Sequence, residues 1–540
     1  MINKQSFIKG TIILMTANAI SKILGAVFKI PLTYLLKEEG MAIYNTAFSV
    51  YIMLLSFIIS GMPLAISKMV AEETARKKPA NVRKIITVST ILLSLLGILG
   101  SAALWFGANF FSFAMKEPKS VFCLKIIAPS VFFVALGTVY KSCYQGLSNM
   151  LPTAISQVIE AFVKLAAGYA LALYYSKLAA EYTAAAAIMG VTIGEIIATF
   201  ILFVLYLPHR FCELSGHSDM KSRDILYGIG TVAIPAICAA AVSAAMNLAD
   251  ISIIRTCLER IHFSPESAEK FLLMYSSYTD VFDNLPQTLK ITQEGSRWLY
   301  GAYSGYALTV FHLPIGILAS LGVSILPVIA GAIAAENRIR AELYMCSAIK
   351  LTLIICLPAA FCIALFSDPI LSLLFKNTAS AQMLSFLAPC LVFISLTQIF
   401  NAISNAGGKI IAPFFIGFAG AAVKLLCNVI FITRPEINML GTVIGANISY
   451  FLVMLLSFGL LRKQFPACCG FFKDFSKIFF CAAISAFIMN ILYTPFTVIF
   501  SAETVSFLLC IAAGGVAYAL LMLFTGCISD EELKIMRRKS

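Results

Sequence analysis

The stretch IITVSTILLSLLGILGSAALWFG, residues 85–107, contains no charged residue and no proline. As an α-helix it would be about 35 Å long at 1.5 Å per residue, enough to cross a hydrocarbon layer about 30 Å thick. The stretch therefore predicts a transmembrane helix.

The rest of the chain has the same character. Of its 540 residues 60% are hydrophobic and 12% charged, whereas soluble domains have about 45–50% apolar and about 25% charged residues. This composition predicts an all-α polytopic membrane protein. The apolar segments long enough to span the membrane are 14 in number, and they begin near residues 7, 41, 84, 121, 152, 183, 226, 298, 345, 384, 412, 439, 474 and 504.

The placement of basic residues predicts the orientation. The net charge of +13 would suggest nucleic acid in a soluble protein. With the N-terminus inside, however, 24 of the 40 Lys and Arg fall at cytoplasmic ends, 12 on the outer side and 4 within the membrane. This is the asymmetry of multi-pass proteins. We therefore expect a multi-pass membrane protein with both termini cytoplasmic, surrounded by lipids and binding no nucleic acid.

No cofactor or metal is expected. The fifteen cysteines form no CxxC pair, the four histidines do not cluster, and the chain has no Walker A motif. Any transport work must then come from an H⁺ or Na⁺ gradient, the membrane potential or a downhill substrate.

The chain contains an internal repeat. A shift of 260 residues places Ala128-Pro129 on Ala388-Pro389 and Val163-Lys164-Leu165 on Val423-Lys424-Leu425, and a shift of 251 places Gly190 and Gly194 on Gly441 and Gly445. An offset of six spans makes the repeats parallel, and such repeats hold the substrate site between them. The predicted parts are an N-terminal six-helix lobe at 1–208, a cytoplasmic linker at 209–223, a C-terminal six-helix lobe at 224–463 with an external loop at 257–297, a helix pair at 464–527, and a basic cytoplasmic tail at 528–540.

Polar stripes follow two helices of the first lobe. Asn18, Lys22, Gly25 and Lys29 share one face of the first span, and Gln157, Glu160, Lys164 and Gly168 share one face of the fifth. Lys22 lies about 20 Å along the helix from Lys9, beyond the reach of snorkelling to the inner surface, whereas Lys29 could snorkel outward. A charge at this depth usually faces a bundle interior or a wet cavity.

More than one role is open for each of the charged residues within the membrane. Glu160 and Lys164 have the spacing of a helical ion pair, so Lys164 either neutralises Glu160 or is recruited by a substrate anion or a coupling ion. Lys424 has no carboxylate within a turn, only Asn428, so it either contacts water or an anion or loses its proton by desolvation, and contact with an anion is favoured. Glu195 is either a proton or sodium site or the partner of a lysine on another helix.

The remaining polar positions are weaker candidates. Gln398, Asn401 and Asn405 form a stripe in the tenth span that interhelical hydrogen bonds would explain equally well. Asp250, near the outer end of the seventh span, is a candidate for ion coupling, charge pairing or an outer gate. Together the lysines predict a central cationic cavity, formed by both lobes, that binds phosphate or pyrophosphate by ammonium point charges.

Several stretches resemble a known family. They are Lys22-Ile-Leu-Gly25, Pro31-Leu-Thr33, Gly40-Met41 with Tyr44, Gly61-Met-Pro-Leu-Ala-Ile-Ser-Lys68 with Glu72, Tyr144-Gln-Gly146, and Met150 through Pro152-Thr-Ala154 to Ser156-Gln-Val-Ile-Glu160. The chain thereby resembles stage V sporulation protein B-like polysaccharide-biosynthesis exporters of the multidrug/oligosaccharidyl-lipid/polysaccharide (MOP) flippase superfamily.

The resemblance implies a protein of the bacterial plasma membrane with two six-helix lobes, a terminal helix pair and alternating access. It also implies an undecaprenyl-pyrophosphate-linked sugar as substrate, lipid II among the candidates, moved outward without enzymatic chemistry and in concert with cell-wall synthesis enzymes. It assigns the pyrophosphate to Lys22 and Lys164, where the family more often has arginine.

Two rival functions remain. A cation-coupled drug exporter of the same superfamily would present carboxylates and aromatics to a cationic drug, whereas lysines dominate here. A polytopic lipid-phosphate-dependent glycosyltransferase would use a carboxylate of the first external loop, where Glu38 and Glu39 lie. Such enzymes generally carry a large external domain, and the loop at 257–297 is short for one.

Overall fold

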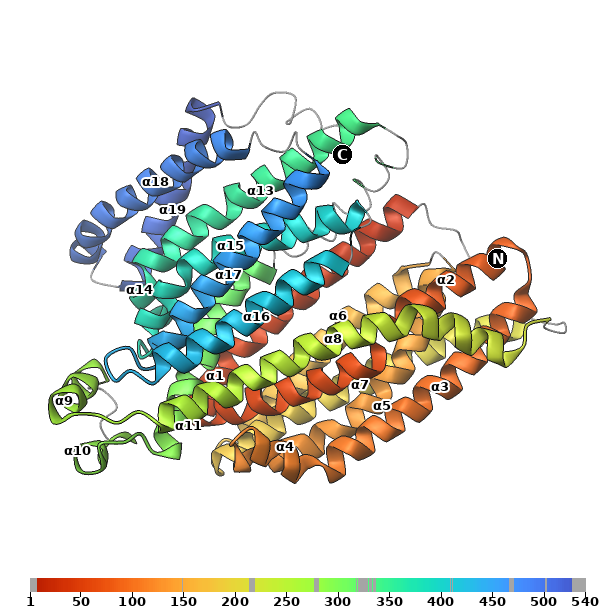
Figure 1. Ribbon diagram of the computed structural model, residues 1–540, viewed down its shortest axis with the longest axis horizontal. Helices are drawn as coiled ribbons and strands as arrows, with labels where there is room; N and C mark the ends of the chain where they lie inside the picture. The colour runs from red at the N-terminus through yellow and green to blue at the C-terminus, as the bar shows by residue number, and fades with distance from the viewer. Residues whose placement is uncertain are drawn as a thin grey trace. The chain divides into compact units, whose positions relative to one another are not determined.

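The chain is seen in a computed structural model (Figure 1). The structure describes residues 7–147, 149–212, 219–275, 281–316, 337–407, 411–465, 471–500 and 503–526, and the single positions 318, 329, 333 and 409. Every regular element among these residues is helical. This confirms the all-α fold predicted from the composition.

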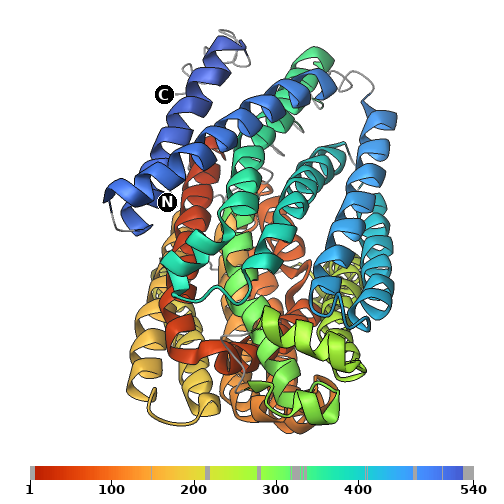
Figure 2. The same ribbon diagram turned by 90° about the vertical axis from the view of Figure 1, so that its left-hand side faces the viewer.

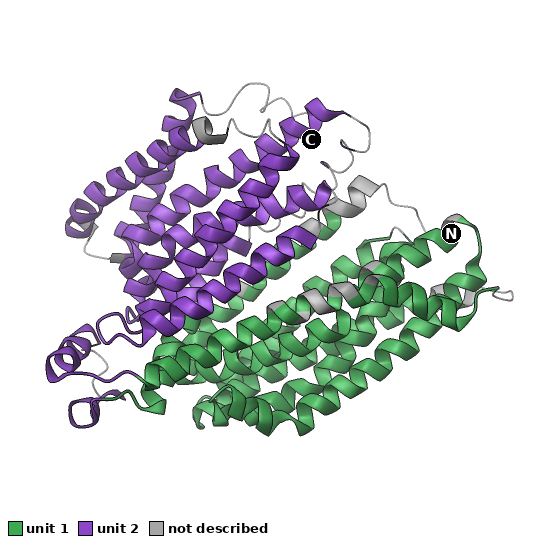
Figure 3. Cartoon of the chain, in the orientation of Figure 1, with its two compact units in different colours: residues 1–260, 290–305 green, residues 261–289, 306–540 purple. Residues whose placement is uncertain are grey.

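The helices form two compact units, shown in two colours in Figure 3. Unit 1 comprises residues 1–260 and 290–305. Its helices are α1 (Phe7–Ile59), α2 (Met62–Ala75), α3 (Pro79–Phe106), α4 (Ala108–Ala114), α5 (Val121–Gly146), α6 (Leu151–Tyr174), α7 (Ala180–Cys212), α8 (Ser222–Glu259) and α11 (Gln293–Ala302), with a 3₁₀ turn η1 at Pro118–Ser120.

Unit 2 comprises residues 261–289 and 306–540. Its described helices are α9 (Pro265–Met274), α10 (Leu285–Thr288), α13 (Arg338–Leu365), α14 (Ser367–Phe375), α15 (Ala381–Ala406), α16 (Ile411–Ile432), α17 (Leu440–Gln464), α18 (Phe471–Phe500) and α19 (Glu503–Phe524). A π-helical turn, η3 (Tyr303–Ala307), carries the chain from unit 1 into unit 2.

Eleven helices among the described residues are long and apolar enough to cross a membrane. One of them, Thr16–Ile59, covers both the first and the second predicted spans. The backbone between these two spans is not helical at Lys37, whose φ is 52° and ψ −163°, so α1 consists of two helices that meet at a kink. Residues 319–328, within the predicted eighth span, lie outside the described residues. The multi-pass architecture is therefore confirmed, and the number 14 stays a prediction.

The internal repeat is visible in the element boundaries. The helix α5 runs from residue 121 to 146 and α15 from 381 to 406, each with an internal proline, Pro129 or Pro389. The residue that follows the short preceding helix segment is left-handed in both copies, with φ 53° at Lys116 and 50° at Lys376. Two lysines in this unfavourable conformation at matching positions of the two copies agree with the predicted register.

The same correspondence holds for α6 with α7 and for α16 with α17. A Cβ atom added at Gly194 would lie 3.0 Å from the Glu160 carbonyl oxygen, and one at Gly445 would lie 3.5 Å from the Lys424 carbonyl oxygen. Each glycine thus packs closely against the lysine-bearing helix of its own unit. Lys164 and Lys424 occupy equivalent places in the two repeats.

The compact units do not end where the sequence places the lobe boundary. The helix α8 belongs to unit 1, because it packs against α1, α2 and α3. The predicted linker at 209–223 is partly helical, with α7 reaching Cys212 and α8 starting at Ser222, and residues 213–218 lie outside the described part. The basic tail at 528–540 also lies outside it.

The predicted terminal pair is α18 and α19, which pack side by side in unit 2 (Figures 1 and 2). The Tyr518 hydroxyl donates a hydrogen bond of 3.0 Å to the Ile354 carbonyl oxygen and so attaches α19 to α13.

Candidate functional site

The two polar stripes of the first lobe lie on adjacent helices. The helix α6 packs against both α1 and α7 in unit 1. The Ser21 hydroxyl of α1 donates to the Gln157 carbonyl oxygen of α6 over 3.1 Å. The close approach of α7 at Gly194 brings Glu195 beside the Glu160 and Lys164 positions. Local helical periodicity and small residues therefore bring together candidates that come from three different helices.

Two of the predicted lysines lie on helices that pack against each other, Lys29 on α1 and Lys164 on α6, and both side chains are partly buried. A Cβ atom added at Gly168, one turn after Lys164, would lie 3.0 Å from the side chain of Phe28, the neighbour of Lys29. The Lys164 Nζ atom lies 4.8 Å from the centroid of the Phe48 ring of α1, a cation–π contact. Ammonium groups placed in this way can bind phosphate as point charges.

Among the described ion pairs, the close partner of Glu160 is Lys141 on α5 and not Lys164. The Glu160 Oε2 atom lies 3.4 Å from the Lys141 Nζ atom, and the close approach of Gly194 to the Glu160 carbonyl oxygen places Glu195 on the adjacent helix beside this pair. The cluster therefore contains two carboxyl groups, Glu160 and Glu195, with Lys141 and Lys164 as neighbouring cations.

Lys141 is a member of the cluster that the sequence assigned to a cytoplasmic helix end. It lies on a different helix from Glu160, so no helical spacing relates the two residues. Its side chain is 24% exposed, and its ion pair with Glu160 makes it a member of the cluster.

A buried acceptor also lies on the α6 stripe. The side-chain oxygen Oε1 of Gln157 is buried, and among the described residues it has no hydrogen-bond partner. The Oε1 atom of Gln398, on the predicted stripe of α15, is in the same state. A buried acceptor of this kind calls for a water molecule or a ligand.

The remaining candidates are distributed over both units. In unit 1, Lys22 is exposed, and Asn18 and Asp250 are partly buried. In unit 2, Asn401 accepts a hydrogen bond of 3.2 Å from Ser457. This contact favours a role for Asn401 in interhelical hydrogen bonding. Lys424 and Asn405 are partly buried. A common cavity that joins Lys424 to the lysines of unit 1 stays a prediction.

Sequence reasoning missed a buried charge network in unit 1. Glu117, just before η1, is fully buried and accepts hydrogen bonds from Arg297 Nε at 2.8 and 2.9 Å. Arg255 Nη2 of α8 lies 2.8 Å from the same carboxylate, and Arg297 Nη1 lies 3.5 Å from Glu39 Oε1. No local pattern could reveal this network, because its members are widely separated in the sequence.

The network also bears on the two acidic residues of the first predicted external loop. Glu39 pairs with Lys119 as well as Arg297. The Glu38 side chain is 7% exposed, and its backbone packs against Gly301. Both residues serve contacts within unit 1, which argues against the catalytic carboxylate that a glycosyltransferase would need there.

Two protein families match this chain, one in its N-terminal half and one in its C-terminal half. Residues 7–239 match the family of polysaccharide biosynthesis proteins, and residues 300–514 match the family of the lipid II flippase MurJ. The chain is 24% identical to stage V sporulation protein B of Bacillus subtilis (strain 168) over 98% of both chains. It is 19% identical to the lipid II flippase MurJ of the same organism over 85% of this chain and 83% of the relative.

Solved structures share the fold. A lipid II flippase MurJ in an inward closed conformation superposes with a TM-score of 0.66 at 17% identity, covering 95% of this chain and 99% of that one. An inward-facing multidrug resistance MATE family transporter of the MOP superfamily also gives a TM-score of 0.66, at 13% identity, covering 85% of this chain and 99% of that one.

Proposed function

We propose that this chain is a flippase of the MOP superfamily and that it moves an undecaprenyl-pyrophosphate-linked oligosaccharide from the cytoplasmic to the outer leaflet by alternating access, as its similarity to polysaccharide biosynthesis proteins and lipid II flippases supports. The similarity to lipid II flippases supports a cell-wall precursor as the cargo, delivered to cell-wall synthesis enzymes. The observation that carries the proposal is the packing of α1 against α6, which brings together two helices that carry the partly buried lysines Lys29 and Lys164. An anionic head group would offset positive charge placed at this depth in the membrane.

The pyrophosphate fits this site by charge. Its oxygens would contact Lys29 and Lys164, and ammonium groups bind phosphate as point charges without a fixed fork geometry. Gln157, on the same helix face as Lys164, would contribute its amide to the polar head group. Lys22, which is exposed on α1, and Lys424, the repeat equivalent of Lys164, are the further cations that the proposal assigns to the transport path.

The carboxyl pair supplies a means of coupling. We propose that Glu160 and Glu195 exchange a proton or Na⁺ during the transport cycle, with Lys141 balancing the charge. A change of charge at Glu160 would be felt by Lys164 one helical turn away, and so would alter the affinity of the lysines for an anion. Asp250 on α8 is the alternative coupling carboxylate.

Complementation of a flippase-depleted strain tests the lysines. We expect Lys29→Ala and Lys164→Ala to abolish growth while protein levels in the membrane stay normal. Lys164→Arg should retain activity, because it keeps the charge, and Lys177→Ala, at an exposed loop lysine, should behave as wild type. Growth supported by both alanine variants would refute the cationic site.

Native mass spectrometry tests the cargo directly. The purified protein should carry a polyprenyl-pyrophosphate sugar, and its occupancy should fall in Lys164→Ala. The rival function, cation-coupled drug export, shares the fold of the MATE transporters. It predicts instead that overexpression raises resistance to cationic dyes, and that the lysine variants leave this resistance intact.

A further inference from the structure

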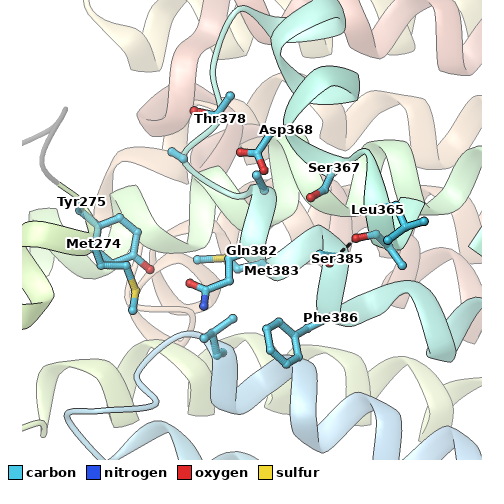
Figure 4. A pocket seen from close by; sticks show the side chains of 14 residues that line it. Met274, Tyr275, Leu365, Ser367, Asp368, Thr378, Gln382, Met383, Ser385 and Phe386 are labelled. Atoms are coloured by element: carbon cyan, nitrogen blue, oxygen red, sulfur yellow. Dashed lines mark hydrogen bonds between the residues drawn. The ribbon is translucent and has the colours of Figure 1, made fainter. Parts of the chain in front are cut away.

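Unit 2 contains a cavity of about 530 Å³. It lies where the ends of α9 and α13 meet the start of α14, the first turn of α15 and the start of α17 (Figure 4). The volume falls within the range of about 300–1,000 Å³ typical of small-molecule sites. All the residues that line it belong to unit 2, so it shares no residue with the charge cluster of unit 1.

The polar side chains of the cavity suit a ligand rich in hydroxyl groups. Asp368, at the start of α14, and Gln382, on α15, are both exposed, and Thr378 contributes a hydroxyl group. A carboxylate accepts hydrogen bonds, an amide both donates and accepts, and a hydroxyl does either. Among the described residues that line the cavity, Asp368 carries the only formal charge. The site therefore lacks the cations that a phosphate group would require.

An apolar surface accompanies these polar groups. The Phe386 side chain is 52% exposed and lies one helical turn after Gln382 on α15, and Met274 of α9 is 43% exposed. A pyranose ring presents C–H groups on one face and hydroxyl groups around its edge. Its C–H face can pack on an aromatic ring while its edge hydroxyls reach a carboxylate and an amide.

The walls of the cavity are held by hydrogen bonds. The Ser385 hydroxyl of α15 donates to the Ala364 carbonyl oxygen of α13 over 2.7 Å, and the Asn447 amide of α17 donates to the Phe386 carbonyl oxygen over 2.7 Å. The Tyr275 side chain is buried and packs against Phe271 with the rings tilted by 49° and their centroids 4.8 Å apart. Burial raises the pKa of Tyr275, which stays a neutral phenol. A site held in this way loses little conformational entropy on binding.

The predicted orientation places the cavity outside. The helix α13 starts at the basic residues Arg338 and Arg340, which mark a cytoplasmic end, and the cavity lies at its opposite end, beyond Ala364. A ligand in this cavity would thus be met on the outer surface.

We propose that this cavity is a saccharide-binding site that holds one or two sugar units, with Asp368 and Gln382 bonded to the hydroxyl groups and Phe386 packed on the ring. Where the source is the lipid-linked cargo, this inference rests on the proposed function and adds a receiving site for its sugar portion on the outer surface. A soluble glycan offers the same chemistry, so the experiment separates the two sources.

The first arm uses soluble sugars with the full-length protein in detergent. Saturation-transfer NMR with cellobiose, maltose and N-acetylchitobiose should detect binding of at least one disaccharide. Asp368→Asn, Gln382→Ala and Phe386→Leu should each weaken it roughly tenfold or more, the loss expected for one charged hydrogen bond or one ring contact. Asp283→Asn, Gln287→Ala and Phe415→Leu, at exposed positions of unit 2 outside the cavity, are the matched controls.

The outcomes of this arm are decisive. No binding of any disaccharide to the wild-type protein would overturn the proposal, as would binding that the three cavity variants leave unchanged. Binding of tri-lysine in place of the sugars would reassign the cavity to a cationic peptide through Asp368 and would also overturn it. The three substituted residues are exposed, and unchanged thermal unfolding of the variants excludes a folding defect.

The second arm identifies the source. In nanodiscs, a synthetic polyprenyl-pyrophosphate disaccharide should bind more tightly than polyprenyl pyrophosphate alone, and this difference should disappear in Gln382→Ala. If the difference persists, the cavity does not receive the sugar of the cargo. Lys164→Ala should weaken both lipids equally, so a failure of the cavity and a failure of the proposed flippase function give different results.

Discussion

At the scale of the residue, Glu117 is the most constrained charge in the described part of unit 1. It is fully buried and neutralises two guanidinium groups, those of Arg255 and Arg297. We expect Glu117→Gln to destabilise the protein by about 3–5 kcal/mol, because removal of one partner leaves buried charge uncompensated. Thermal unfolding of the purified protein measures this. Glu39→Gln is the control, since its carboxylate is 42% exposed and should contribute about 1 kcal/mol or less. Equal effects of the two substitutions would contradict the assignment.

The paired carboxyl groups make a second prediction at this scale. Glu195→Gln preserves the shape of the side chain, so the fold should be retained. The shared proton or cation is lost, however, and transport in proteoliposomes should no longer respond to an imposed H⁺ or Na⁺ gradient that accelerates the wild-type protein. Asp250→Asn should keep the response. Loss of the response in Asp250→Asn alone would move the coupling site to α8.

The individual charges differ in how far the sequence reveals them. The sequence alone identifies Lys29, Lys164 and Glu160 as candidate site residues. Each is a charge within an apolar helix, where insertion into the membrane is costly and a charge usually has a function. The sequence does not identify Lys141 and Glu117 in this way. Each lies near a helix end, where charge is ordinary, and its burial depends on partners on other helices.

At the scale of the element, the approach of α7 to α6 positions Glu195 beside Glu160. A Cβ atom at Gly190 would lie 2.3 Å from the Gly168 Cα atom, which is backbone and cannot yield. We expect Gly190→Ala to push the two helices apart, to cost about 1–3 kcal/mol in unfolding free energy, and to reduce transport by separating the carboxyl pair.

Gly459→Ala is the control for that substitution. Nothing lies within 4 Å of a Cβ atom at Gly459 on α17, so the change should be neutral or slightly stabilising. Unfolding midpoints and transport rates of the two variants, compared with those of the wild type, decide the matter. Wild-type behaviour of Gly190→Ala would show that the helices can separate without loss.

The elements also show what hydropathy records and what it leaves out. The apolar runs beginning near residues 7 and 41 predict two spans, and the non-helical backbone at Lys37 divides α1 into two helices between them. Hydropathy records this interruption through the charges Lys37, Glu38 and Glu39. It does not record what packs against the interruption, such as Gly301 of α11 against the Glu38 backbone.

At the scale of the whole molecule, the internal repeat was predictable and the division into units was not. The register of the repeat follows from identities such as Lys164 and Lys424, and the left-handed pair Lys116 and Lys376 repeats it in the backbone. The unit boundary depends instead on the packing of α8 with α1, α2 and α3. An apolar helix carries little sequence information about which neighbours cover it.

The repeat makes a prediction about topology. The helices α3 and α13 both begin with basic residues, Arg83 and Lys84 in one and Arg338 and Arg340 in the other, so both should start on the cytoplasmic side. Parallel repeats with an even number of spans then place both termini inside. Green fluorescent protein fused after Ser540 should fluoresce, whereas alkaline phosphatase fused there should be inactive. Alkaline phosphatase inserted between α9 and α10 should be active outside. Phosphatase activity of the fusion after Ser540 would require an odd number of spans, and an inactive insertion between α9 and α10 would place the saccharide cavity on the cytoplasmic side; either result would contradict the predicted topology.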